Sequence, residues 1–174
     1  MQQSREQPSG EAPPTAPRGV RPIVGWLDVA GAAATDTRSI VRDHERFFVE
    51  GSPTEDGVSA LERQAAAFCA AVINRHVALV DHYHARLKSV GASKRLVNAI
   101  ERADGSPDLV PRMVAILRYV RVLADGPRAI RCSHFRLLQD HGLELTDIVA
   151  LTRLITFVNY QAGLLAGLDL LQGA

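Results

Sequence analysis

Residues 61–91 read LERQAAAFCAAVINRHVALVDHYHARLKSVG and carry the clearest helical pattern of the chain. In the first half, apolar residues recur mostly every three or four positions, at Leu61, Ala65, Phe68, Val72 and Ile73. This spacing places them on one helical face, so we expect a helix over 58–74. A similar stripe continues at Leu79, Val80, Tyr83 and Leu87. Gly91 follows with Lys88 close before it, which is typical of a helix C-terminus, so a second helix is expected to end there.

The whole chain after about residue 35 is expected to be helical. We expect further helices over 37–50, 93–103, 109–124 and 134–141, and a last helix from Thr146 to about Leu171. Ser133 is expected to cap the helix over 134–141, and Gly142 to end it. No long stretch alternates with a period of two, and no Asn-Gly or Asp-Gly pair joins two β-branched runs. The sequence therefore predicts an all-α fold of about seven helices.

Composition indicates one globular domain preceded by a tail. The 174 residues are 47% apolar and 22% charged, as in ordinary folded proteins. Residues 1–20 hold four prolines and few large apolar side chains, so we expect a flexible tail there and a single helical domain over 21–174. The formal net charge is +1, and the basic residues are scattered without interleaved aromatic residues. That pattern argues against binding to nucleic acid or to an anionic membrane surface.

The cellular compartment is predicted from three absences. The first 17 residues lack the apolar segment of a secretory signal. The longest apolar stretch without a charge lies between Arg153 and Asp169 and has 15 residues, whereas a bilayer span needs about 20. Two cysteines make no disulfide framework. We therefore expect a soluble, reduced, cytoplasmic protein.

The last expected helix is unusual because residues 147–171 are apolar on nearly all sides. Such a helix is buried on most faces, so it forms either a central helix or a subunit interface. Close approach of another helix is favoured by its small residues Ala162, Gly163, Ala166 and Gly167. Asn159 and Gln161 require hydrogen-bond partners if they are buried. An equally weighted alternative is a core helix whose two amides face water.

Few residues form a pattern that carries chemistry. No two of the six histidines stand four residues apart on one helix, and His82 and His84 point in different directions. We therefore expect neither a metal site nor another cofactor. Cys69 and Cys132 do not form a Cys-x-x-Cys motif, and both are expected to be inert thiols. No serine nucleophile motif and no glycine-rich phosphate loop are present.

Two segments resemble the carboxymuconolactone decarboxylase/alkylhydroperoxidase D-like family. The first is residues 61–91, matching through Ala71-Val72-Ile73-Asn74 to Leu87 and Val90-Gly91. The second resembles the peroxidase-related branch of the family at 116–119 (ILRY), 141–143 (HGL), 147–149 (DIV), 157–161 (FVNYQ) and 166–168 (AGL). Together the segments span most of residues 61–171. The resemblance implies the family's helical fold and assembly into trimers or hexamers.

The resemblance also implies where the reactive residues would be. Members carry a Glu on one helix and Cys-x-x-Cys-x-x-x-His at the start of the next, and these groups perform thiol redox chemistry on peroxides. A gap-free alignment on Asn74 and Gly91 puts Gln64 at the Glu, His76 and Leu79 at the two Cys, and Tyr83 at the His. None of these four residues preserves the chemistry of the family, since Leu79 forms no thiolate and Gln64 accepts no proton as a carboxylate does.

Three functions follow from this departure. Our main interpretation is a catalytically degenerate homo-oligomer with a binding or assembly role and a small pocket for a small-molecule ligand. The first alternative is a peroxidase-related oxidoreductase that uses non-standard residues. The second is a non-redox decarboxylase or isomerase in which His76, at the start of a helix, is a neutral base. We expect Gln64, His76 and Tyr83 to lie near one another around a partly buried cavity. The sequence names no substrate.

Overall fold

The computed structural model describes residues 57–102 and 109–172. It contains α3 (Ala60–Asn74), α4 (Val77–Ser89), α5 (Lys94–Arg102), α6 (Pro111–Asp125), the 3₁₀ helix η1 (Pro127–Ala129), α7 (Cys132–Asp140) and α8 (Leu145–Gln172). No strand occurs in these two ranges, which confirms the all-α prediction. The expected tail at 1–20 and the expected helix at 37–50 lie outside the described residues.

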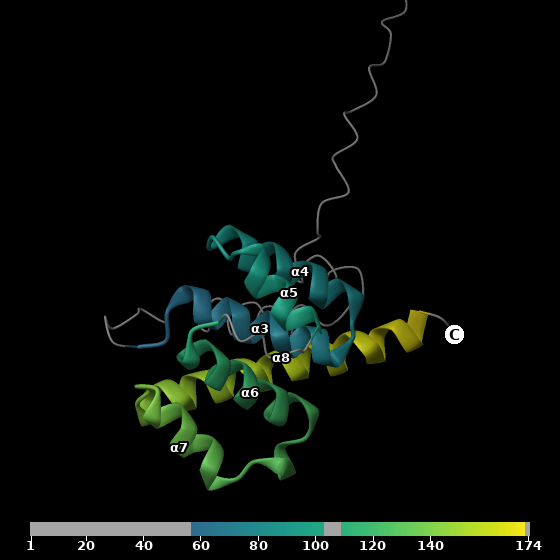
Figure 1. Cartoon of the computed structure of the whole chain (residues 1–174). Helices are drawn as coiled ribbons and strands as arrows, with labels where there is room; N and C mark the ends of the chain where they lie inside the picture. The colour runs from purple at the N-terminus through teal and green to yellow at the C-terminus, as the bar shows by residue number, and fades with distance from the viewer. Residues whose placement is uncertain (1–56, 103–108, 173–174) are drawn as a thin grey trace, which may run out of the picture.

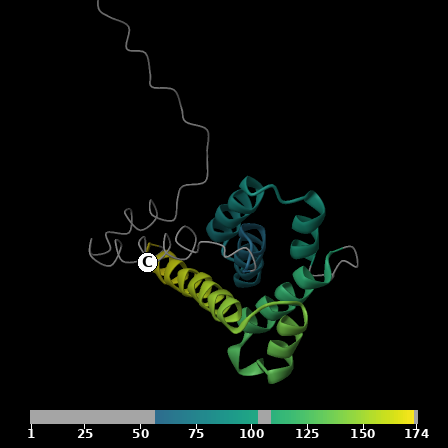
Figure 2. The same cartoon turned by 90° about the vertical axis from the view of Figure 1, so that its left-hand side faces the viewer.

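Helix α3 occupies the centre of the molecule and packs against α4, α5, α6 and α8. In both views α4 and α5 lie above α3, while α6 and α7 lie below it (Figures 1 and 2). Five alanines of α3 are completely buried: Ala65, Ala66, Ala67, Ala70 and Ala71. Their small side chains allow the neighbouring backbones to come close. The core therefore surrounds the helix that the opening stretch of sequence predicts most clearly.

The turn between α3 and α4 is two residues long and brings the helices into a hairpin. Arg75 adopts the left-handed conformation, with φ of 58°, and its N–H donates to the carbonyls of Ala71 and Val72. His76 is extended and is the N-cap of α4. Gly91 and Gly142 also have positive φ, at 80° and 79°, after α4 and α7. Glycine adopts this conformation without steric penalty, so both predicted helix ends are confirmed.

Two predicted helix starts differ in detail from the structure. Ser133 lies inside α7, and the expectation that it caps the helix is wrong. The N-cap is Arg131, whose N–H donates to Nδ1 of His134 at 3.0 Å. Helix α8 begins at Leu145, so Thr146 lies within it, and Asp147 accepts a hydrogen bond from the N–H of Glu144 at 3.0 Å. A side chain in the first turn of each helix satisfies the exposed donor of the N-cap residue.

Helix α8 is the longest element and extends beyond the rest of the described body at its C-terminal end (Figure 2). Its buried face includes Ile148, Leu151, Ile155, Val158 and Leu165. Residues 145–167 are long and apolar enough to cross a membrane by length and composition, but half of this window is buried inside the protein. Tyr160, Gly163, Ala166 and Gly167 are exposed on the other side. The helix is thus both a core element and an apolar surface.

Candidate functional site

His76 lies at the α3–α4 turn, where the alignment places the first cysteine of the family. Its Nε2 is 3.1 Å from Oδ2 of Asp169 on α8, and its side chain is 13% exposed. The other ring nitrogen, Nδ1, is buried and has no hydrogen-bond partner among the described residues. The expectation that His76 starts a helix is confirmed.

Tyr83 lies one and a half turns into α4 and is completely buried. Its hydroxyl donates to Oε1 of Gln161 on α8 at 2.6 Å. Burial raises the pKa of the Tyr83 phenol, and the hydrogen bond to Gln161 offsets only part of this effect. The phenol therefore stays protonated at neutral pH. Gln161 is 1% exposed, and its Nε2 has no hydrogen-bond partner within the described part of the chain.

Gln64 is buried near the beginning of α3, and it makes no hydrogen bond to His76 or Tyr83. Ten residues separate it from Asn74, which corresponds to about 15 Å along the helix. Side chains lean toward the N-terminus of their own helix, so Gln64 leans away from the turn while Tyr83 leans toward it. His76 and Tyr83 thus both contact α8, and no contact of Gln64 with either of them is found among the described residues.

A third polar contact joins the hairpin to α8. Nδ2 of Asn74 donates to Oδ1 of Asn159 at 2.7 Å and also lies 2.8 Å from the carbonyl of Ala70. We call the three pairs Asn74–Asn159, Tyr83–Gln161 and His76–Asp169 the α8 junction. The amide oxygens of Asn159 and Gln161 therefore both accept a hydrogen bond, whereas Nε2 of Gln161 has no partner among the described residues. Sequence reasoning singled out Asn159 and Gln161 but not their partners or Asp169, because these pairs lie 78 to 93 residues apart.

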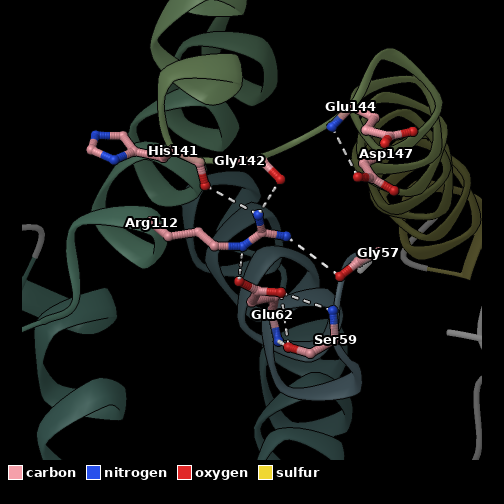
Figure 3. Close-up of polar contacts among 8 residues, drawn as sticks. All are labelled: Gly57, Ser59, Glu62, Arg112, His141, Gly142, Glu144 and Asp147. Carbon is pink, nitrogen blue, oxygen red and sulfur yellow. Dashed lines mark hydrogen bonds and ion pairs between the residues drawn. The ribbon is translucent and has the colours of Figure 1, made fainter. Parts of the chain in front are cut away.

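At the other end of α3, an ionic cluster that sequence reasoning missed holds three chain segments together (Figure 3). Nε of Arg112 donates to Oε1 of Glu62 at 2.7 Å, and Nη1 donates to the carbonyls of His141 and Gly142 at 3.1 and 2.7 Å. Glu62 also completes a capping box with Ser59. We call Ser59, Glu62 and Arg112 the Arg112 cluster. The Ser-x-x-Glu spacing was its only sequence signal.

Other ionisable groups in the core are held in their neutral forms. Burial raises the pKa of the Cys69 thiol to about 11, against a smaller opposing effect of Arg121. Burial, helped by Arg86, lowers the pKa of His82 to about 4. Cys132 is exposed on α7. Among residues 57–102 and 109–172, no group of three His, Cys, Asp or Glu side chains could hold a metal ion. The arrangement therefore presents neutral hydrogen-bonding groups rather than a ready nucleophile.

Two cavities are lined by described residues alone, and both lie on α6. Neither includes Gln64, His76 or Tyr83. Whether these three side chains face a cavity of their own stays a prediction.

Comparison with known proteins identifies the fold. No family model and no curated protein matches the sequence. The structure is similar to an uncharacterized peroxidase-related protein from Silicibacter sp. TM1040, with a TM-score of 0.72 and 15% identity over 83% of this chain and 73% of that one. It is also similar to the alkylhydroperoxidase AhpD core of a peroxidase-related protein from Ralstonia eutropha JMP134, with a TM-score of 0.68 and 16% identity over 82% and 78%. The chain thus has the AhpD-like helical fold that the resemblance implied.

Proposed function

We propose that this protein of AhpD-like fold performs no dithiol chemistry and has a binding or assembly role. The observation that carries the proposal is the buried 2.6 Å hydrogen bond between Tyr83 and Gln161. Tyr83 stands at the position that the alignment gives to the family's histidine, and its hydrogen bond attaches α4 to α8. A side chain engaged in this way, with a raised pKa, is a poor proton relay.

The remaining reactive positions support the same proposal. Leu79 is a completely buried apolar residue at the position of the second cysteine. Gln64 carries no charge where the family has a carboxylate. Cys69 is buried with a raised pKa, so its thiolate is scarce at neutral pH. The chain thus lacks the paired thiols that would give two electrons to a peroxide and form a disulfide.

A peroxide-consumption assay tests this proposal directly. The full chain is incubated with tert-butyl hydroperoxide and dithiothreitol, and peroxide loss is compared with a protein-free control. We expect no excess turnover. Turnover that disappears in Cys69→Ser or Cys132→Ser would instead establish the alternative of an oxidoreductase with non-standard residues. Turnover that survives both substitutions would point to a non-thiol peroxidase and also overturn the proposal.

Assembly is supported by the outer face of α8. Tyr160 and Leu170 are 52% and 77% exposed there, beside the exposed Gly163, Ala166 and Gly167. We expect a second copy of the chain to cover this face in a homo-oligomer, a trimer or hexamer as the resemblance implies, soluble in the cytoplasm. Light scattering at micromolar concentration measures the mass. A monomer at that concentration would remove this part of the proposal.

The pair His76–Asp169 favours one second candidate, a non-redox decarboxylase or isomerase. If Nε2 carries the proton and donates it to Asp169, the lone pair of the buried Nδ1 is free to accept a proton from a substrate. An activity found by substrate screening would support this candidate if it disappeared in His76→Ala and resisted thiol-blocking reagents.

A further inference from the structure

A groove runs along the outer side of α6, on a part of the molecule remote in sequence from the reactive positions of the family. Its larger cavity has a volume of about 280 Å³ and lies between α6 and α7, lined by Leu109, Pro111, Val114, Ala115, Arg118, Leu137 and His141. A smaller cavity of about 80 Å³ extends toward α5 and shares Leu109, Val114 and Arg118 with it. Because three lining residues are common to both, the cavities are neighbours along α6, and we call them together the groove.

The lining of this groove combines an apolar floor with unopposed positive charge. No acidic residue lines either cavity. Arg118 lines both of them, is exposed, and has no hydrogen bond or ion pair within the described ranges. The other arginines of α6 are engaged, since Arg112 binds Glu62 and Arg121 donates to the carbonyl of Ala99 at 3.3 Å. Arg118 is therefore the one arginine of α6 that has no partner among the described residues.

We propose that this groove binds a small amphipathic carboxylate, whose anionic end pairs with Arg118 and whose aliphatic body lies on Val114, Ala115 and Leu137. A guanidinium matches a carboxylate with two parallel N–H donors. The apolar walls exclude water from the aliphatic part. A volume of about 280 Å³ lies near the lower limit of small-molecule pockets and is too small to enclose a helix of a partner protein. The inference goes beyond the proposed function and holds whether or not the reactive positions of the family are inert.

Calorimetric titration of the full chain with decanoate, below its micelle concentration, tests this inference. We expect saturable binding at one site per chain, and much weaker binding of decanol, which has the same aliphatic chain without the charge. Arg118→Gln should weaken decanoate binding roughly tenfold, because it removes the only charged hydrogen bonds to the ligand. Leu137→Trp should abolish binding by filling the groove. Thermal melting of each variant verifies that it is folded.

Two controls separate this site from other effects. Arg128→Gln removes an exposed arginine of η1 that lines neither cavity, so it should leave decanoate affinity unchanged. Tyr83→Phe alters the α8 junction and should also leave it unchanged. The inference is wrong if decanoate does not bind, if decanol binds equally well, or if Arg118→Gln and Arg128→Gln have the same effect. Each of these results is independent of the peroxide assay.

Discussion

The two ends of helix α3 are secured by opposite kinds of chemistry. At its start, the Arg112 cluster joins α3 to α6 and to the segment after α7 through a carboxylate, a guanidinium and backbone carbonyls. At its end, the α8 junction relies on two neutral amide-type contacts and one partly exposed ion pair. Both sets of contacts tie distant segments together, but only the first depends mainly on charge.

The charged contacts lie at the start of α3, whereas the neutral contacts lie near the turn at which the alignment places the reactive groups of the family. Burial raises the pKa of the Glu62 carboxyl, but hydrogen bonds from Arg112 and Ser59 outweigh it and hold that pKa below its usual value. At the other end, Tyr83 and Gln161 carry no charge at neutral pH. Tyr83, which the alignment places at the family's histidine, hydrogen-bonds to Gln161 on α8. The comparison therefore predicts different responses to substitution and to acid.

The largest effect is expected at the charged end. Arg112→Met leaves Glu62, which is 9% exposed, without its cation and frees two carbonyls. We expect the free energy of unfolding to fall by about 3 kcal/mol, as when one partner of a mostly buried pair is removed. Urea unfolding followed by circular dichroism measures this loss. Arg118→Gln is the matched control on the same helix and should change stability by less than about 0.5 kcal/mol.

Mild acid should weaken the core around His82 on α4 before it weakens the Arg112 cluster. His82 has a folded-state pKa of about 4, below its unfolded value near 6.5, so the unfolded chain binds the proton first. Stability is therefore highest above pH 6.5 and falls by about 3 kcal/mol as the pH falls to 4. Glu62 adds its own loss only below about pH 4.5, because its folded-state pKa is depressed.

The variant His82→Gln should flatten the stability profile between pH 6.5 and 4, whereas the neighbouring His84→Gln should preserve the slope. Urea midpoints measured across this pH range provide the comparison. An unchanged slope in His82→Gln would mean that another group binds the proton.

A smaller effect is expected at the Tyr83–Gln161 bond. Tyr83→Phe leaves Oε1 of the buried Gln161 without its donor and should lower stability by about 1 to 2 kcal/mol. Adding Gln161→Met removes the unsatisfied amide, so the double variant should recover most of the loss. If the double variant were less stable than the single one, Gln161 would have a second role, such as holding a water or ligand at its Nε2.

The smallest effect is expected at the exposed part of the α8 junction. Asp169 is 56% exposed in its side chain, so its ion pair with His76 is screened by solvent. His76→Ala and Asp169→Asn should each change stability by less than about 1 kcal/mol, and 0.5 M NaCl should reduce the difference. A larger loss that salt does not reduce would show that the ring of His76 stabilises the turn through packing.

The helices were predictable because their signals are local. Apolar spacing predicted α3, α4 and α6, cap and turn residues predicted α5, α7 and the start of α8, and Gly91 and Gly142 marked two helix ends. The start of α7 was not predictable, since Ser133 is a common cap while Arg131 is not. There the extended backbone of Arg131 and the Nδ1 acceptor of His134 replace a side-chain cap.

The pairings within the candidate site were not predictable in the same way. Burial identified Asn159 and Gln161 as residues that need partners, but their partners depend on how α3, α4 and α8 pack. Arg112 could not be singled out because no local pattern distinguishes it from the other arginines among the 18 in the sequence. Its partner Glu62 lies 50 residues away.

The completely buried alanines of α3 leave little room for a larger side chain at the centre of the described body. A methyl group contributes little apolar area, so this helix gains its cohesion from many short-range dispersion contacts between closely approaching backbones. A gap of about 0.5 to 1 Å already costs a quarter to a half of the energy of such a contact. An alanine side chain has no rotamer change that could restore it. An added methylene at Ala66 or Ala70 would push several helices apart together, whereas the larger side chains near the surface have room to adjust. The alanines of α3 thus limit how closely the neighbouring helices pack.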